Sequence, residues 1–210
     1  FSYYDTQNGF HIYKNDYALP MGFTFDTYVS RSQWETYSES DRCNLLLRAL
    51  VLEDDAVETY QKDMQKLPDA VHQMSDEDLL AECTERAKTA CDSFTYNSKG
   101  FHATISTDHA NLVFFSVPWE EGWSAEVNGE PVAIEKADIG FMAVPVAAGD
   151  SEITFTYHTP GLKAGALLSL GGLVLFAGYL TVAGIWNKRH PSPKAESVCC
   201  MDYSAEETAN

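Results

Sequence analysis

Hydrophobic positions recur with strand spacing over much of the chain. Residues 9–15 alternate apolar and polar side chains and predict a strand, and residues 17–30 predict a second extended segment. Asn128-Gly129 is the dipeptide pair most typical of a tight β-hairpin. Further on, short apolar segments separated by turn residues predict strands at 93–97, 101–106, 111–117, 123–127, 131–136, 141–147 and 151–158. Strands at this spacing favour a mainly β fold, an antiparallel β-sandwich.

The pattern changes to a helical period between these two β regions, in the N-terminal half. Residues 31–52 fit one or two helices, with Ser40 as the expected N-cap. Ser75 precedes three acidic residues, which predicts a capped helix start and a helix over 76–90. Residues 53–70 are acidic and weakly patterned, so we expect a loop or a poor strand there.

A stretch of twenty-three uncharged residues, 164–186, follows the last predicted strand. As a helix it would be about 35 Å long, enough for a hydrocarbon core of about 30 Å. The alternative is a buried core helix, but core helices of this length rarely lack every charge. The sequence therefore predicts an extracytoplasmic domain over 1–160, a transmembrane helix over 161–186 and a disordered cytoplasmic tail over 187–210.

The orientation follows from the basic residues beside the span. Lys188, Arg189 and Lys194 lie on the tail side and Lys163 alone on the other, so the tail should be cytoplasmic. The chain starts without Met and without a signal-like segment. We therefore expect either earlier spans in a longer chain or a mature chain whose signal was removed. The short connection after the last strand should hold the domain near the membrane.

Charge narrows the classes of partner. Residues 1–160 carry 27 of the 31 acidic residues and 10 of the 14 basic ones. This excess argues against nucleic acid, and against direct binding of anionic lipid or polyphosphate without a divalent cation. We expect Cys43, Cys83 and Cys91 to be unpaired, although spacing alone leaves a disulfide among them open.

No specific catalytic constellation stands out. The sequence has no Gly-rich phosphate loop, no nucleophile elbow and no zinc motif, so we assign no catalytic, cofactor-binding or metal-binding residue. Trp119 and Trp123 flank the turn that contains Glu121. Exposed aromatic rings stack on sugars, but the same pair would also serve to pack the ends of two strands. Trp119, Glu121 and Trp123 are the candidate substrate-binding residues.

Several short motifs lie at both ends of the domain and cover most of its second half, whereas residues 53–92 carry none. They are N-x-Y-A-L-P-x-G at 15–22, P-x-x-x-G-W at 118–123, V-x-G at 127–129, G-F-x-x-V at 140–144, A-G-D at 148–150 and Y-x-x-P-G at 157–161. Together these motifs resemble the C-terminal end of the YfhO family of bacterial polytopic membrane proteins.

The resemblance implies a parent protein similar to membrane glycosyltransferases, which use lipid-linked sugars and decorate cell-surface polymers such as lipoteichoic acid. The catalytic acids of such enzymes are expected in early extracytoplasmic loops, so no catalytic residue is carried over to this chain. No cofactor is expected here, and a divalent cation in the parent is left open. Earlier spans would export the domain.

We therefore expect the C-terminal extracytoplasmic domain and last span of a YfhO-like glycosyltransferase in the bacterial cell membrane, with an accessory role. Its expected partners are the lipid bilayer, other transmembrane helices of the parent, and a lipid-linked sugar or cell-wall glycopolymer. The alternative is a non-enzymatic, membrane-anchored module for binding or scaffolding at the cell surface. A third reading is a transporter in which the sandwich gates the substrate path.

Overall fold

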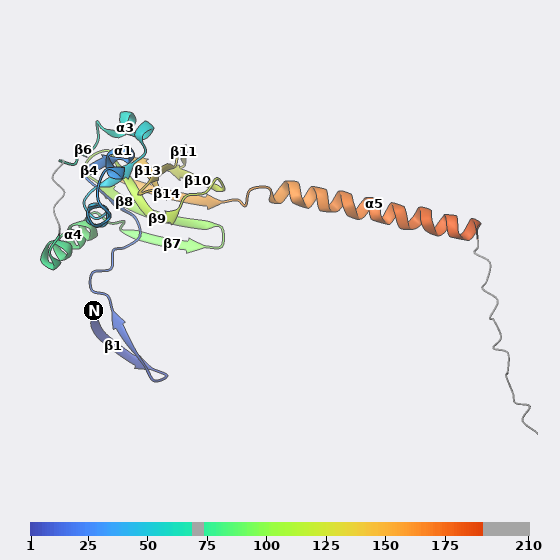
Figure 1. The fold of residues 1–210 in the computed structure, drawn as a ribbon, viewed down its shortest axis with the longest axis horizontal. Coiled ribbons are helices and arrows are strands. Elements are labelled where there is room, and N and C mark those ends of the chain that lie inside the picture. Colours follow the sequence, from blue (N-terminus) through green and yellow to red (C-terminus); the bar gives the residue numbers. More distant parts are fainter. Residues whose placement is uncertain (69–73, 191–210) are drawn as a thin grey trace, which may run out of the picture. The chain divides into compact units, whose positions relative to one another are not determined.

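The computed structural model describes residues 1–68 and 74–190 and divides the chain at Gly161 (Figure 1). The first unit is mostly β. Its strands are β1 (Ser2–Gln7), β2 (Phe10–Lys14), β3 (Phe23–Thr24), β4 (Thr27–Ser30), β5 (Leu50–Leu52), β6 (Gln65–Lys66), β7 (Ser93–Asn97), β8 (Gly100–Thr107), β9 (Asn111–Pro118), β10 (Trp123–Val127), β11 (Glu130–Val132), β12 (Glu135–Ala137), β13 (Phe141–Val146) and β14 (Gly149–Tyr157). Its helices are α1 (Arg31–Glu35), α2 (Glu39–Leu45), α3 (Asp54–Tyr60) and α4 (Asp76–Lys88).

Two sheets form the predicted sandwich, and a third sheet stands apart. The smaller sheet of the sandwich has the order β11-β10-β14-β8-β7, and the larger has the order β3-β9-β13-β12-β5-β4-β6. Neighbouring strands are antiparallel except that β4 runs parallel to both β5 and β6. β1 and β2 pair with each other as a two-stranded sheet. The mainly β fold predicted from the sequence is confirmed.

The main core lies between the two sandwich sheets. Strand β9 supplies Val113 and Phe115 to it, and β14 supplies Ile153 and Phe155, all of which are fully buried. Side chains of a strand alternate between faces, so Leu112 and Phe114 point to the opposite face of the larger sheet. They are buried there in a second cluster. Both faces of β9 are therefore covered, which explains its unbroken apolar run.

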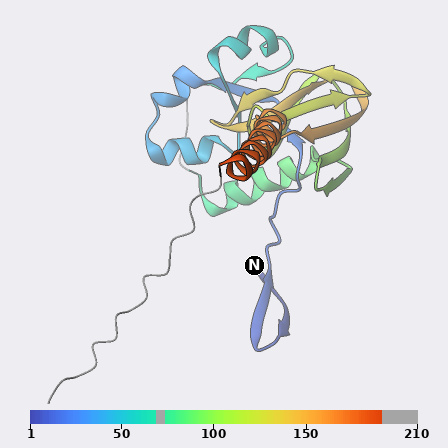
Figure 2. The same ribbon diagram turned by 90° about the vertical axis from the view of Figure 1, so that its right-hand side faces the viewer.

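Helices and loops of the N-terminal half cover that second face (Figure 2). Ala56 and Tyr60 of α3 pack in the cluster with Leu112 and Phe114. Helix α4 is tied to β3 by Arg86, which is buried and donates a hydrogen bond of 2.6 Å to the carbonyl oxygen of Thr24. A small third cluster joins α2 to β4 and β5.

Several expectations for residues 31–70 were wrong. The last apolar residues of the predicted helical region, Leu50–Leu52, form strand β5 because each is buried between neighbouring elements. Ser38, not Ser40, caps α2, and its hydroxyl accepts from the Asp41 amide. The acidic stretch expected as a loop or a poor strand contains helix α3, and the strand alternative holds only for its later part, the short strand β6.

The segment expected as one strand over 131–136 is two strands. β11 pairs with β10 in the smaller sheet, whereas β12 pairs with β13 in the larger one. The chain crosses from one sheet to the other between Val132 and Glu135, and the partly buried side chain of Ile134 packs against the core at this crossing. One apolar run therefore serves both sheets, and periodicity alone does not reveal such a crossing.

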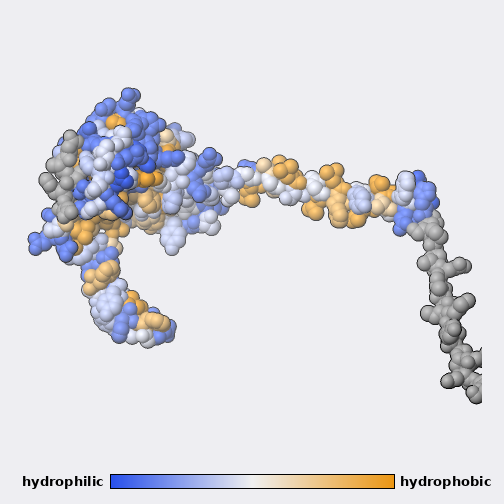
Figure 3. Space-filling view, viewed as in Figure 1, coloured by the Kyte–Doolittle hydropathy of each residue, from blue (hydrophilic) through white to orange (hydrophobic). Residues whose placement is uncertain are grey.

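The second unit contains one long helix, α5 (Leu162–Arg189), which includes the predicted span. In the described part of the chain it is the one helix long and apolar enough to cross a membrane. Apolar side chains cover its length, and Lys188 and Arg189 lie in its last turn (Figure 3). The tail predicted to be disordered lies outside the described residues, apart from its first four positions.

Candidate functional site

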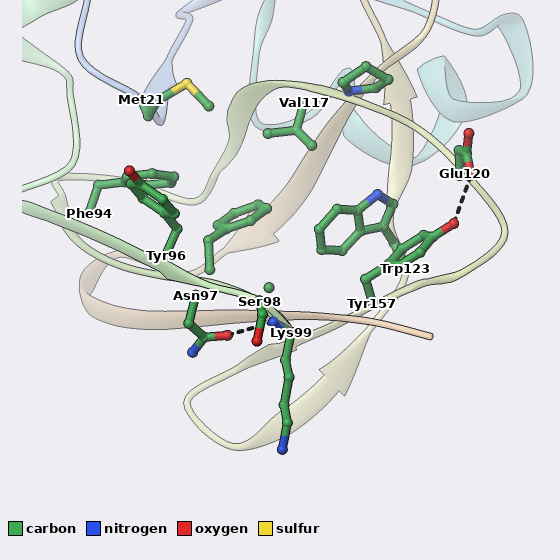
Figure 4. Close-up of a pocket in the computed structure, with 13 residues that line it drawn as sticks. Met21, Phe94, Tyr96, Asn97, Ser98, Lys99, Val117, Glu120, Trp123 and Tyr157 are labelled. Atoms are coloured by element: carbon green, nitrogen blue, oxygen red, sulfur yellow. Dashed lines mark hydrogen bonds between the residues drawn. The ribbon is translucent and has the colours of Figure 1, made fainter. Parts of the chain in front are cut away.

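A cavity of about 580 Å³ opens at one end of the sandwich. It lies where β8 and β10 begin and where β14 ends, beside edge strand β7 (Figure 4). Its lining residues are Met21, Phe94, Tyr96, Asn97, Ser98, Lys99, Gly100, Phe101, Val117, Pro118, Glu120, Trp123 and Tyr157. Most of these residues are aromatic or aliphatic, and the polar ones come from the β7–β8 turn and from the turn before β10.

Aromatic rings from four strands build the wall. The Phe101 ring centroid lies 5.4 Å from that of Phe94 and 5.6 Å from that of Trp123. Phe101 also stacks on the buried ring of Phe155 at 4.4 Å, so the wall continues into the sandwich core. Aromatic pairs at these separations stabilise one another beyond their area of burial. The rings are thus held in fixed positions by the fold.

Tyr157 closes one side of the cavity. Register places it opposite Trp123 on β10, and the two ring centroids are 5.0 Å apart. Its hydroxyl donates a hydrogen bond of 3.0 Å to the Glu120 carboxylate. This bond raises the pKa of Tyr157 above its ordinary value, because the phenol proton is held by the carboxylate.

The turn before β10 packs closely on the end of β14. The Gly122 carbonyl accepts a hydrogen bond of 2.8 Å from the amide of His158. A Cβ atom on Gly122 would lie 2.5 Å from Cε2 of Tyr157 and 2.6 Å from the His158 carbonyl oxygen. Only glycine fits without a shift of one of these groups. The glycine of the G-W pair therefore allows the turn to approach the end of β14 this closely.

The structure separates the three predicted substrate-binding residues. Trp123 lines the large cavity. Trp119 lines a different hollow of about 420 Å³, and the Lys136 ammonium lies 3.8 Å from the centroid of its ring. Glu121 is exposed in the turn between them and lines neither. Both tryptophans also pack against the sandwich core, which fits the alternative reading that they close the ends of strands.

Glu120, rather than its neighbour Glu121, is the acidic residue at the cavity. Glu120 was not among the residues predicted to bind substrate, and neither were Tyr157, Phe101 and Tyr96, which also line the cavity. Tyr157 belongs to the Y-x-x-P-G motif, so a signal was present, but nothing in the sequence shows that it faces Trp123. Tyr157 and Trp123 become neighbours because β10 pairs with β14.

The lining of the cavity combines aromatic faces with a few polar groups. Flat aromatic faces provide stacking surfaces, and Glu120, Asn97 and the Tyr157 hydroxyl provide polar groups at the edge. Among residues 1–68 and 74–190, no group of three His, Cys, Asp or Glu side chains is placed to hold a metal ion. Cys43, Cys83 and Cys91 are unpaired there.

Comparison with known proteins agrees with the motifs. Residues 70–169 match the sequence profile of the family described as "Bacterial membrane protein YfhO". The chain is 30% identical over 121 residues to "Uncharacterized protein YfhO" of Bacillus subtilis (strain 168). That alignment covers 58% of this chain and 13% of the relative. No solved structure matches the chain significantly.

The matched residues include strands β7 to β14 and the start of α5. They supply every wall of the large cavity except the side chain of Met21. The membrane family also agrees with the apolar helix α5. The resemblance inferred from the sequence motifs is confirmed: residues 70–169 match the YfhO family of bacterial membrane proteins, and the chain is similar to the B. subtilis protein of that name.

Proposed function

We propose that this chain is the extracytoplasmic sandwich and last span of a YfhO-like membrane glycosyltransferase. In this proposal the parent transfers sugars from a lipid carrier to cell-surface polymers, and the present domain holds one of these substrates without reacting with it. The binding role is inferred from one observation, the aromatic cavity bounded by Trp123 and Tyr157.

Three features support a saccharide as the occupant. The rings of Trp123, Phe94 and Tyr96 line an open hollow, where they offer apolar faces to the C–H face of a sugar ring. A carboxylate lies at its edge and accepts from a phenol, leaving lone pairs for sugar hydroxyls. The cavity is also larger than a single water site and suits a small organic ligand.

Chain connectivity supports action beside a membrane. Tyr157 is the last residue of β14, and α5 begins at Leu162. The four residues between them span about 14 Å at most. Lys188 and Arg189 in the last turn of α5 favour a cytoplasmic C-terminus, which would leave residues 1–160 outside.

Binding is the test. The purified chain in detergent would be titrated with lipoteichoic acid, with and without Mg²⁺, while its tryptophan emission is recorded. Mg²⁺ is included because a net negative domain repels a polyanion. We expect saturable binding that Trp123→Leu weakens about tenfold, through loss of one stacking contact, and that Trp119→Leu leaves unchanged. Leucine keeps an apolar contact with Phe101 and Phe155 but removes the stacking face.

Thermal unfolding of both variants provides the control for folding. If Trp123→Leu unfolds with the wild-type midpoint and binds the polymer with wild-type affinity, the cavity is not the binding site. Binding by the chain with no sugar transfer by its parent would instead favour the non-enzymatic surface module. The mass of the native polypeptide separates these readings further, since the alignment covers 13% of the B. subtilis relative and a parent of that length would be several times longer than this chain.

A further inference from the structure

The β1–β2 hairpin exposes an unusual amount of apolar surface. Tyr4 and Phe10 are 70% and 75% exposed, and Tyr3 and Tyr13 are close to 60%. The hairpin forms a sheet of its own, and every residue of β2 is exposed to solvent. An isolated two-stranded sheet is at best marginally stable in water. The hairpin therefore has the features of an element that is completed by another surface.

Apolar side chains occupy both faces of this hairpin. Tyr3 lies opposite Tyr13, and the two ring centroids are 6.1 Å apart. Phe10 and Ile12 alternate with Tyr13 along β2 and so point to the other face. A protein partner that packs on one face would leave the other face in water. A medium that surrounds the hairpin satisfies both faces at once.

The charge of the hairpin favours lipid as this medium. Residues 1–17 carry Asp5, Asp16 and one basic residue, Lys14, whereas the remainder of the unit up to residue 160 is strongly acidic. An acidic surface is repelled by the anionic face of a membrane. The hairpin thus has a smaller electrostatic cost of contact with a membrane than the rest of the unit taken together.

The residue types of the hairpin also favour lipid as its surroundings. Four of the first seventeen residues are tyrosines, and tyrosine collects at the membrane–water interface because its ring is apolar and its hydroxyl is polar. The Tyr3 hydroxyl already pairs with Thr6 Oγ1 at 2.8 Å, so it does not enter the bilayer unpaired. Residues 15–22 link the hairpin to β3 and reach about 26 Å when extended.

We propose that the β1–β2 hairpin lies in the interfacial layer of the same bilayer that α5 crosses, with Phe10 and the tyrosines among the lipid headgroups. The partner is the lipid surface itself, not a specific lipid. The hairpin and α5 then fix the acidic unit at two points rather than one. The proposal rests on the span and the hairpin, and it is independent of any sugar bound in the cavity.

Quenching by brominated lipid tests this directly. The full chain would carry Trp186→Phe, to remove the tryptophan of the span, and be placed in nanodiscs made of phosphatidylcholine dibrominated near the glycerol end of its acyl chains. Phe10→Trp adds a reporter to the hairpin. Leu79→Trp adds a matched reporter to α4, where the side chain is 40% exposed among acidic residues.

We expect the brominated lipid to remove most of the added emission of Phe10→Trp and little of that of Leu79→Trp. Equal quenching at the two positions would overturn the proposal. Hydrogen exchange of residues 2–14 supplies a second measurement, because exchange should slow in nanodiscs relative to a lipid-free amphipol. Slow exchange in both media, with no quenching, would mean that the hairpin docks on protein, and the proposal would fail.

Discussion

Asp138 is the residue whose titration should affect the fold most. Its side chain is 9% exposed, and it accepts a hydrogen bond of 2.9 Å from the Val51 amide. Burial raises the pKa of this carboxyl to about 7, although the amide bond lowers it in part. The unfolded chain has the ordinary pKa near 3.9. Between these values the folded state binds the proton more tightly than the unfolded state does.

The first prediction is that ionisation of Asp138 lowers the free energy of unfolding as pH rises from about 4 to 7. The loss should be of the order of 4 kcal/mol, because the folded state holds the proton to a higher pH than the unfolded state does. Asp138→Asn keeps an oxygen acceptor for Val51 and tolerates the positive φ of 44° found there. Chemical unfolding at pH 5 and pH 8 should therefore show a smaller difference for the variant than for the wild type. An equal difference would mean that Asp138 titrates normally.

Among single residues, the sequence singled out Trp119 and Trp123 as candidates but did not reveal which side chains surround each of them. Trp119 and Trp123 are four positions apart and look equivalent in the pattern. Trp123 is the first residue of β10 and faces Tyr157, whereas Trp119 lies before the turn and meets Lys136 of β12. The difference depends on strand pairs far apart in the sequence, so local reasoning could name the residues but could not assemble the site.

At the scale of elements, predictions succeeded where local chemistry decides. The helix start at Ser75 is an example, because a capping box needs only neighbouring residues. In the structure the Ser75 hydroxyl accepts from the Asp78 amide, and the Asp78 carboxylate accepts from the Ser75 amide. The Asp78 carboxylate also accepts a hydrogen bond of 2.8 Å from the Ser75 hydroxyl, and this bond, followed by the one from the Ser75 amide, lowers the pKa of Asp78.

The second prediction concerns this cap. Ser75→Ala should cost about 1 kcal/mol of helix stability and speed hydrogen exchange in the first turn of α4. Thr84→Ala is the matched control, since Thr84 is exposed in the middle of the same helix and bonds back to the Leu80 carbonyl. In the Thr84→Ala variant, hydrogen exchange in the first turn of α4 should be unchanged. A cap variant that exchanges like the wild type would show that tertiary packing alone holds this end.

Elements were missed where tertiary packing decides. Leu50–Leu52 continues a helical pattern but forms a strand, because β4 and β12 pair with it on either side. Helix α3 begins at Asp54 without a side-chain cap bond, and its acidic start resembles a solvated loop. Ala56 and Tyr60 are buried against the larger sheet, which is what stabilises the helix.

At the scale of the whole molecule, the orientation in the membrane is the claim that is most open to experiment. The domain carries an exposed, unpaired thiol at Cys43, while the half-buried thiol of Cys91 has its pKa raised to about 12 by burial. A thiol with so high a pKa reacts slowly, because the thiolate is the reactive form.

The third prediction is that a membrane-impermeant maleimide labels Cys43 in intact cells, once the cell wall is made permeable. Cys43→Ser should remove this label, and Cys91→Ser should leave it in place. Cys199 and Cys200 should be labelled only after the membrane is lysed. The reverse pattern, with the tail thiols labelled first, would place residues 1–160 in the cytoplasm and remove the basis for an extracellular role.

The most direct test of the proposed binding role is the rate of the proposed sugar transfer by the full-length parent in membranes, measured for Trp123→Leu beside Trp119→Leu. Replacing a residue that only binds substrate should raise KM and leave kcat unchanged. Loss of one stacking contact, about 1.4 kcal/mol, predicts an increase in KM of about tenfold for Trp123→Leu and none for Trp119→Leu. Equal KM values for both variants and the wild type, at normal expression, would contradict the account.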